Sequence, residues 1–371
     1  MSRFLGNLNP SAWAALRCPD FAASAQNGDT LPVLPVRDAA DNAPLPALPP
    51  DIAARALFLP PLRFTPAPGF GRVPDDLFHA LLLETGGSVR RSGFQKILLF
   101  NTSARARPAV ETAALDLRDR EGLDALVLHR ETAVAAVETP PLPLVVVPLA
   151  AVEQHGPHLP TGTDALLNEA LLDRALDNLP PGAPVFTAPP VLVGRSSEHF
   201  GFDGTLSLTT ETLRRLLLSL AGNLRAGGFG KTAFFNTHGG NSAVVRQVVA
   251  ELAEAGAPVA LLRAHRLAER RLVGGISPRE AQWGFHAGDW ETSLMLAARP
   301  GLVRMDAAVR EWPAPLERLG GGLSAAWLTR DISRSGVMGD ATAATAEKGA
   351  RWLAEAARAL AEEIAALLKT P

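Results

Sequence analysis

Two stretches of the chain resemble each other closely enough to constrain its architecture. SGFQKILLFNTSARARPAV (92–110) aligns with GGFGKTAFFNTHGGNSAVV (227–245) at an offset of 135 residues. Farther along at the same offset, Leu117, Ala125 and Leu126 match Leu252, Ala260 and Leu261. Self-similarity at about 130 residues predicts tandem domains rather than a solenoid of short repeats.

The offset between the two copies grows along the chain. Pro60–Pro61 aligns with Pro189–Pro190 at an offset of 129, and three positions align at an offset of 113: Pro35, Pro44 and Asp51 with Pro148, Pro157 and Asp164. A duplication with insertions in the second copy produces such a drift, whereas the alternative is chance similarity between Ala- and Leu-rich segments. We expect two tandem domains, residues 1–136 and 140–371, joined by the Pro-rich segment 138–143.

Strand-like and helix-like segments alternate through the second copy. Short apolar runs indicate strands, and longer segments between them indicate helices; the strands are 143–149, 184–194, KTAFFN (231–236) and 258–265, and the helices 166–179, 208–230, 244–255 and 343–368. Alternation of this kind is typical of an α/β fold with a mainly parallel sheet.

Composition excludes several classes of function. The chain has 36 basic and 38 acidic residues among 371, so its charge offers no footprint for nucleic acid or an anionic membrane. Cys18 is the only cysteine, which excludes an intrachain disulfide and a cysteine zinc cage. The start of the chain lacks an apolar run of signal-peptide length, and no run approaches 18 apolar residues. We therefore expect a soluble cytoplasmic protein that acts on a small molecule.

The segment VEQHGPHLPTGTD (152–164) concentrates metal-ligating side chains. It holds Glu153, His155 and Asp164, with His158 nearby. A strand ending at Val152 would place Glu153 and His155 on the same side, at the sheet edge where α/β proteins bind ligands. Carboxylates and imidazoles without thiolates suit catalytic Zn²⁺, Mn²⁺ or Fe²⁺. The alternative is a polar loop with solvated histidines.

Three further motifs carry chemistry. NTHGGN (236–241) places His238 after a strand, with glycines whose N–H groups can approach a ligand. FHAGDWETSLML (285–296) contains His286, Asp289 and Glu291, although two acids here could simply stabilise a helix N-terminus. GRSSEHFGFDGTLSL (194–208) contains three candidate substrate contacts, Ser197, Glu198 and His199.

Taken in order, these motifs resemble the creatininase family of creatinine amidohydrolase-like proteins. The ending SGVMGDATAATAEKG (335–349) is also similar to that family, and the resemblance covers about residues 140–371. It implies a three-layer α/β/α fold, here duplicated in tandem, and a centre of two divalent metal ions. It also implies hydrolysis of a non-peptide or cyclic C–N bond in a homo-oligomeric enzyme.

Carried over by position, the resemblance implies a ligand set and one departure from it. The implied ligands are Glu153, His155, Asp164 and His238, with Asp164 bridging the ions. Creatininase proper has a glutamate two residues after the counterpart of His238, where this chain has Gly240. Our candidate for the missing carboxylate is Glu291.

The expected reaction uses a water activated by the metals as the nucleophile. His286 or Glu291 would return a proton to the leaving nitrogen, and His286 or the Gly239–Gly240 backbone would stabilise the oxyanion. The residues expected to contact substrate are Ser197, Glu198, His199, Gly239, Gly240, Asn241, Asp289 and Trp290. Trp283 and Trp290 could also roof the pocket, although packing is an equally good interpretation of each.

The first copy has lost these ligands in the alignment. Ala40, Asn42 and Ser103 face Glu153, His155 and His238, and only Asp51 remains, opposite Asp164. We therefore expect residues 1–136 to form a metal-free pseudodomain that replaces a neighbouring subunit, covers the site or shapes specificity.

Three functions fit the second copy. The leading interpretation is an amidohydrolase acting on a small cyclic amide or acyl-amide metabolite. A peptidase or deformylase of the same family is the second. A non-catalytic metal- or ligand-binding protein is the third, and the intact ligand set argues against it.

Overall fold

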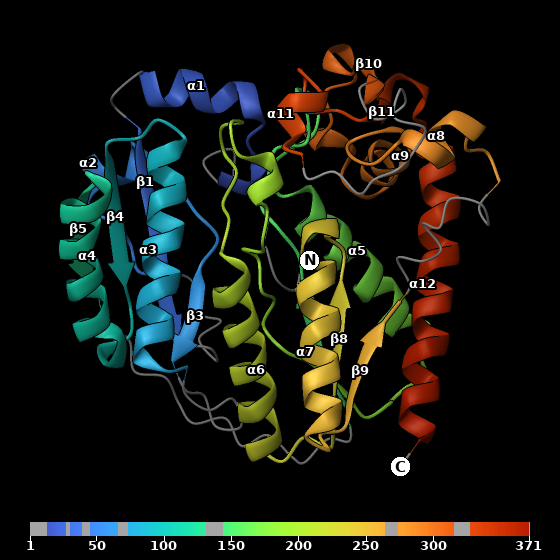
Figure 1. Cartoon of the computed structure of the whole chain (residues 1–371), viewed down its shortest axis with the longest axis horizontal. Coiled ribbons are helices and arrows are strands. Elements are labelled where there is room, and N and C mark those ends of the chain that lie inside the picture. Colours follow the sequence, from blue (N-terminus) through green and yellow to red (C-terminus); the bar gives the residue numbers. More distant parts are fainter. Residues whose placement is uncertain are drawn as a thin grey trace.

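The computed structural model describes residues 13–26, 30–38, 45–65, 73–130, 144–263, 274–314 and 327–370. Two parallel sheets lie side by side in it (Figure 1). The first has the strand order β2-β1-β4-β5 with β3 also paired to β1, and the second has the order β7-β6-β8-β9. The strands are β1 Leu31–Asp38, β2 Ala56–Phe58, β3 Leu62–Thr65, β4 Lys96–Asn101, β5 Asp124–His129, β6 Leu144–Leu149, β7 Val185–Thr187, β8 Lys231–Asn236 and β9 Val259–Leu262.

The helices cover these sheets unequally. They are α1 Cys18–Gln26, α2 Pro50–Ala53, α3 Asp75–Arg91, α4 Arg107–Glu121, α5 Thr163–Asp177, α6 Thr210–Ala226, α7 Ser242–Glu254, α8 Pro278–Trp283, α9 Asp289–Ala298, α11 Thr329–Ile332 and α12 Ala346–Lys369. The second sheet has α6 and α7 on one face and α5, α9 and α12 on the other, which confirms the α/β fold with three layers. Among the described residues, α3 and α4 cover one face of the first sheet and the single turn α2 contributes to the other.

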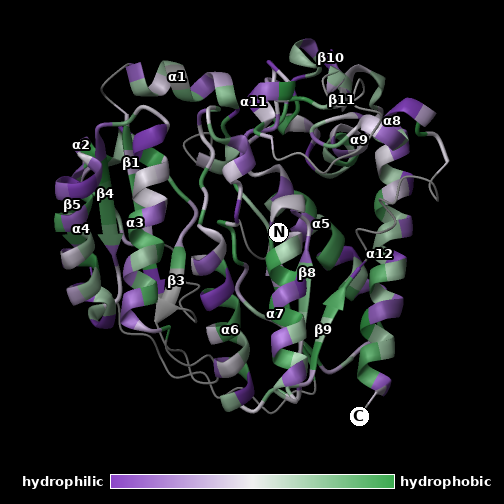
Figure 2. Ribbon diagram, in the orientation of Figure 1, coloured by the Kyte–Doolittle hydropathy of each residue, from purple (hydrophilic) through white to green (hydrophobic). Residues whose placement is uncertain are grey.

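Side-chain alternation explains the layering. Strand β6 (LVVVPL) is buried along its whole length, as expected for a central parallel strand. Val145 and Val147 point to the α6 and α7 side, whereas Leu144 and Val146 point to the α5 and α12 side. In Figure 2 the exposed helices carry hydrophilic and hydrophobic stripes, as amphipathic covering helices do.

The element boundaries differ from the sequence prediction in two informative places. Helix α5 begins at Thr163 rather than 166, so Asp164 lies in its first turn. The predicted strand 184–194 is reduced to β7 and an isolated bridge at Val191, because Pro189 and Pro190 have no N–H to donate. The predicted joint at 138–143 lies outside the described residues.

The registers of the two sheets reproduce the offsets found in the sequence. Pro35 pairs with Phe100 in the first sheet, and Pro148 pairs with Phe235 in the second. The offset from Pro35 to Pro148 is 113 residues, and that from Phe100 to Phe235 is 135. Val33 pairs with Phe58 as Val146 pairs with Thr187, which corresponds to 129 on the outer strand.

The offset between the last strands of the two sheets, β5 and β9, differs from the sequence alignment by one residue. Leu99 pairs with Val127, whereas Phe234 pairs with Leu261, which is an offset of 134. The predicted match of Ala125 with Ala260 is therefore one residue out of register.

The two halves contact each other through α3 and α6. Glu84 on α3 accepts hydrogen bonds from the Thr209 N–H (2.8 Å) and the Thr212 hydroxyl (2.6 Å) at the start of α6. Ser88 Oγ on α3 accepts from the Ser207 N–H at 3.1 Å. These contacts fix the first half against the loops that precede α6.

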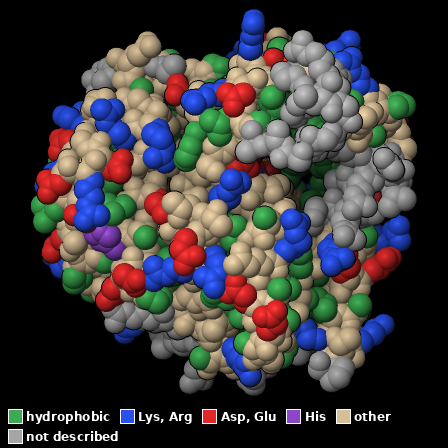
Figure 3. All heavy atoms as spheres, viewed as in Figure 1, with side chains coloured by type: hydrophobic (Ala, Val, Ile, Leu, Met, Phe, Trp, Pro, Cys, Tyr) green, Lys and Arg blue, Asp and Glu red, His purple; other side chains and the backbone are tan. Residues whose placement is uncertain are grey.

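The surface charges agree with the balanced charge of the sequence. Acidic and basic side chains are interspersed on the face drawn in Figure 3. No helix in the described part of the chain is long and apolar enough to cross a membrane.

Two helical glycines should respond oppositely to alanine. A Cβ on Gly349 of α12 would lie 1.8 Å from the Ser293 carbonyl oxygen of α9, whereas one on Gly222 of α6 would meet nothing within 4 Å. We expect Gly349→Ala to lower the free energy of unfolding by about 3 kcal/mol through overpacking. Gly222→Ala should raise it by about 0.5–1 kcal/mol through helix propensity. Chemical denaturation checks both values, and equal effects would contradict the packing described here.

Candidate metal centre

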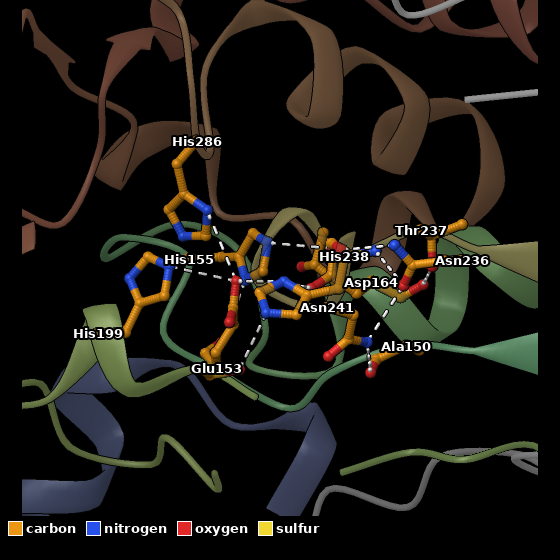
Figure 4. A network of polar contacts seen from close by, with 12 residues as sticks. Ala150, Glu153, His155, Asp164, His199, Asn236, Thr237, His238, Asn241 and His286 are labelled. Atoms are coloured by element: carbon orange, nitrogen blue, oxygen red, sulfur yellow. Dashed lines mark hydrogen bonds and ion pairs between the residues drawn. The ribbon is translucent and has the colours of Figure 1, made fainter. Parts of the chain in front are cut away.

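The candidate site lies where β6 and β8 end, at the carboxyl edge of the second sheet (Figure 4). Glu153 follows β6, and His238 follows β8 by two residues. Asp164 lies in the first turn of α5 and Glu291 in the first turn of α9, while His286 precedes α9. The fold therefore brings three separate sequence motifs together.

The first ligand group consists of Glu153, Asp164 and His238. His238 Nδ1 lies 3.3 Å from Glu153 Oε1 and 3.2 Å from Asp164 Oδ2. On the far side of the ring, Nε2 lies 2.8 Å from the Arg195 carbonyl oxygen and donates to it. This hydrogen bond leaves the Nδ1 lone pair facing the two carboxylates, as a metal ligand requires.

The second ligand group consists of His155, Asp164 and Glu291. His155 Nε2 lies 3.8 Å from Asp164 Oδ1 and 3.9 Å from Glu291 Oε2. The other ring nitrogen of His155, Nδ1, donates to the Glu153 carbonyl oxygen at 3.1 Å. Asp164 contributes to both groups, so the geometry supports a bridging role for it.

The donor atoms of these groups fit a divalent cation. In each group the donor atoms lie within 4.8 Å of one another. Glu153 Oε2, His155 Nε2 and Asp164 Oδ2 are buried without a hydrogen-bond partner among the residues that the structure describes. Buried polar atoms left unpaired are destabilising, and a metal ion would satisfy all three. Carboxylates with imidazoles are donors suited to Zn²⁺ and Mn²⁺.

The electrostatics of the metal-free cluster follow from its burial. Burial raises the pKa of Asp164 to about 7, with the charges of Glu153 and Glu291 adding to the effect. Burial also lowers the pKa of His155 well below its usual range, and the neighbouring His286 lowers it further. Burial opposes protonation of His238, but Glu153 and Asp164 outweigh it and raise the His238 pKa.

Two more histidines line the cluster. His286 Nε2 donates to the Gln154 carbonyl oxygen at 2.7 Å, and its Nδ1 lies 3.7 Å from Glu153 Oε1. The His286 ring lies between those of His155 and His199, tilted by 37° and 34°, with both centroids 4.2 Å away. His199, which we expect to contact substrate, has Nε2 3.3 Å from Glu153 Oε1. It therefore faces a candidate metal ligand.

Gly240 has no room for a side chain. A Cβ there would lie 2.2 Å from Glu198 Oε1 and 2.3 Å from the Arg195 carbonyl oxygen. Glu198 is itself held by the Arg195 guanidinium at 3.0 Å and lies 3.9 Å from His238 Nε2. A carboxylate at position 240 is excluded by these neighbours, whereas Glu291 lies in one candidate ligand group with His155 and Asp164.

Three residues that we expect to bind substrate have partners within the protein. The Asn241 side chain accepts from the Arg195 N–H at 2.9 Å and donates to the Ala150 carbonyl oxygen at 3.0 Å. The Asp289 carboxylate forms a 2.6 Å ion pair with Lys348. The Trp290 ring stacks on Trp352 with centroids 4.9 Å apart, a packing role.

Sequence reasoning missed two residues that shape the site. The Gln154 side chain donates to His199 Nδ1 at 2.8 Å. Glu280 on α8 is buried, and its carboxylate accepts from the Asp289 N–H (2.8 Å) and the Asp340 N–H (2.9 Å). Glu280 thereby holds the turn that carries His286 and Glu291, and its segment PREAQW gives no sign of this role.

An N-terminal segment braces the metal-binding loop. The Leu16 carbonyl accepts from the Thr161 N–H at 2.7 Å, and the Ala14 carbonyl accepts from the Gly162 N–H at 2.9 Å. Fully buried Trp13 donates its indole N–H to the Gly204 carbonyl at 2.8 Å. Thr161 in turn accepts from the Glu153 N–H, and Gly162 precedes α5 with Asp164. We call residues 13–16 the brace.

A model of the creatininase family, described as creatinine amidohydrolase, matches residues 128–364. The mycofactocin precursor peptide peptidase of Mycolicibacterium smegmatis is 37% identical over 232 residues, covering 60% of this chain and 85% of the relative. The creatinine amidohydrolase of Pseudomonas putida is 30% identical over 186 residues, covering 46% of this chain and 70% of the relative.

Solved structures show the same similarity. A manganese creatininase aligns with a TM-score of 0.50 at 25% identity, covering 61% of this chain and 91% of that one. A creatininase with one tryptophan replaced by phenylalanine aligns with a TM-score of 0.50 at 26% identity, covering 61% and 92%. The family match begins at residue 128, so the brace lies outside it.

Metal affinity should depend on pH through Asp164. Burial holds the pKa of this carboxyl at about 7, so a proton occupies the bridging position below that pH. We expect the affinity for Zn²⁺ to fall as pH drops below 7, measured by chelator competition. An affinity that is flat between pH 6 and 8 would contradict this assignment.

Truncating Trp13 in the brace should weaken metal binding more than truncating an equally buried ring elsewhere. Trp13→Ala and Phe100→Ala both remove a fully buried ring and should each lower stability by about 3–5 kcal/mol. Trp13→Ala alone should also lower metal affinity about tenfold, because a disturbed outer-shell support typically weakens a metal site by that order. Chelator competition on folded protein measures this, and equal affinities in the two variants would refute the brace.

Proposed function

Because the chain belongs to the creatininase family, we propose that it is a metal-dependent hydrolase that cleaves an amide bond in a short peptide. The support for a peptide is the stronger similarity to precursor peptide peptidases, which exceeds that to creatinine amidohydrolase in both identity and length. Gly240 also departs from the creatininase pattern. The single observation that carries the catalytic assignment is the pair of ligand groups sharing buried Asp164.

A small cyclic amide is the second candidate substrate. It is favoured by the similarity to creatinine amidohydrolase over 186 residues. The two candidates share the chemistry of attack on an amide carbonyl, and they differ in the size of the group that must fit beside the metal centre.

Each residue has a defined role in the proposed reaction. Zn²⁺ or Mn²⁺ at the centre would supply a nucleophilic water of lowered pKa and would polarise the carbonyl. Glu153, Asp164 and His238 would hold the first ion, and His155, Asp164 and Glu291 would hold the second. Glu291, with 21% of its side chain exposed, can take the proton that the attacking water releases and hand it to the leaving nitrogen. His286, which faces Glu153, can contact the developing oxyanion.

We further propose that the first half is a metal-free copy of the second. Asn101 holds Ser103 through bonds of 2.7 and 3.0 Å, and Asn236 holds His238 in the same way through bonds of 2.7 and 3.3 Å. Ser103 has no imidazole, so this turn keeps its shape and has no histidine ligand. Ala40 and Asn42, opposite Glu153 and His155, lie outside the described residues, and Asp51 is exposed on α2.

Substrate profiling tests the proposed reaction. We expect Zn²⁺- or Mn²⁺-loaded enzyme to hydrolyse short peptides in a chelator-sensitive reaction, followed by mass spectrometry, and to leave creatinine intact. Glu291→Gln should lower kcat/KM by about a hundredfold or more, as loss of a general acid does. Glu251→Gln, which removes a surface ion pair with Arg214, is the matched control. Hydrolysis of creatinine without peptides would favour the second candidate, and turnover of neither would support a binding protein.

A further inference from the structure

A cavity of about 420 Å³ lies between the two halves, beside the metal centre. Helix α3 and the last residue of α4 form its wall from the first half. Segments 195–200 and 207–210 contribute the wall from the second half. Its volume is typical of sites that bind small molecules or single residues of a peptide.

Arg91 gives the cavity its chemistry. Its guanidinium lies over the Phe200 ring, 4.7 Å from the centroid, and Nη2 donates to Ser88 Oγ at 2.8 Å. Within the described part of the chain, Arg91 forms no ion pair. The surrounding protein lowers the Arg91 pKa, and the charges of Glu121 and Glu84 offset only part of that effect. The guanidinium therefore has N–H groups and charge available for an anion.

Two other charged groups of the cavity, Glu84 and Arg195, are already engaged, and the third, exposed Glu121 at the end of α4, is an acid whose charge acts on Arg91. Glu84 accepts from the Thr209 N–H (2.8 Å) and hydroxyl (3.0 Å), which stabilises the start of α6. Arg195, on the opposite wall, forms a 3.0 Å ion pair with Glu198. Of the two cations of this cavity, Arg91 is thus the one that forms no ion pair among the described residues, and Glu121 is the first of the acids whose charge acts on it.

Segment 195–200 connects the cavity to the metal ligands. Arg195 and Phe200 line the cavity, while the Arg195 carbonyl accepts from His238 Nε2 at 2.8 Å. His199, in the same segment, lies 3.3 Å from Glu153 Oε1. A group bound in the cavity would therefore lie one short segment away from the metal centre.

We propose that this cavity binds the terminal carboxylate of a peptide substrate, with Arg91 as the main contact. The apolar side chain of the last residue would lie against Phe200 and Leu208, which also line the cavity. The inference rests on the proposed peptidase function. Arg91 precedes the family match, which begins at residue 128. The first half would therefore have a role in substrate specificity.

Binding of an inert probe tests the site directly. N-acetyl-leucine carries the carboxylate and N-acetyl-leucinamide lacks its charge, so calorimetry on the full chain isolates that group. We expect the acid to bind about tenfold more tightly than the amide, the size of one charge-assisted hydrogen bond. Arg91→Gln should abolish this preference, Arg91→Lys should retain part of it, and Arg90→Gln on the same helix should leave it intact. Equal binding of acid and amide, or a preference that survives Arg91→Gln, would overturn the proposal.

Kinetics separate this inference from the proposed function. With peptides ending in a free carboxylate, Arg91→Gln should raise KM about tenfold with little change in kcat, and peptide amides should not respond. Cleavage of acids and amides alike by both proteins would remove the cavity's role and leave the peptidase standing. Tight binding of the acid that depends on Arg91, without cleavage of any peptide, would support the site and refute the peptidase.

Discussion

The candidate metal centre depends on one buried carboxylate, that of Asp164. It lies 3.2 Å from His238 and 3.8 Å from His155, and it is the ligand common to both groups. Burial is the main cause that raises its pKa to about 7, so the metal-free cluster holds charge that the surrounding protein does not neutralise. A cation placed among these donors removes that imbalance, which explains why buried acids and imidazoles can face one another there.

Several parts of the chain serve to place that carboxylate. Helix α5 begins immediately before it, and the brace fixes the preceding Thr161 and Gly162. A Cβ on Gly162 would lie 2.7 Å from the Ala14 carbonyl oxygen, so the loop and the brace fit each other closely. The first half therefore contributes to the site from two directions, through the brace and through the contact of α3 with α6.

Much of the fold followed from the sequence because local rules determine it. Buried apolar runs such as β6 pair as parallel strands, and the growing repeat offset recurs in the registers of both sheets. The ligand motifs could be found because imidazoles and carboxylates follow strand ends. Glu291 could be chosen only because Gly240 lacks a side chain.

The remaining features depend on contacts distant in sequence. Gln154, Glu280 and the brace act through hydrogen bonds to backbone groups, and such bonds leave no pattern in the residues that accept or donate them. The partners of Asn241 and Asp289 also lie far away in sequence, on Arg195 and Lys348. The single turn α2 follows β1, whereas the full helix α5 follows β6.

Metal stoichiometry tests the central claim, that Asp164 bridges two ions in the second half while the first half binds none. The chain, loaded with Zn²⁺, passed through a desalting column and analysed by mass spectrometry for metals, should carry two ions per chain. Asp164→Asn should lose both ions together while keeping its fold. Retention of one tightly bound ion by Asp164→Asn, or more than two ions in the unmodified chain, would contradict the shared-ligand centre.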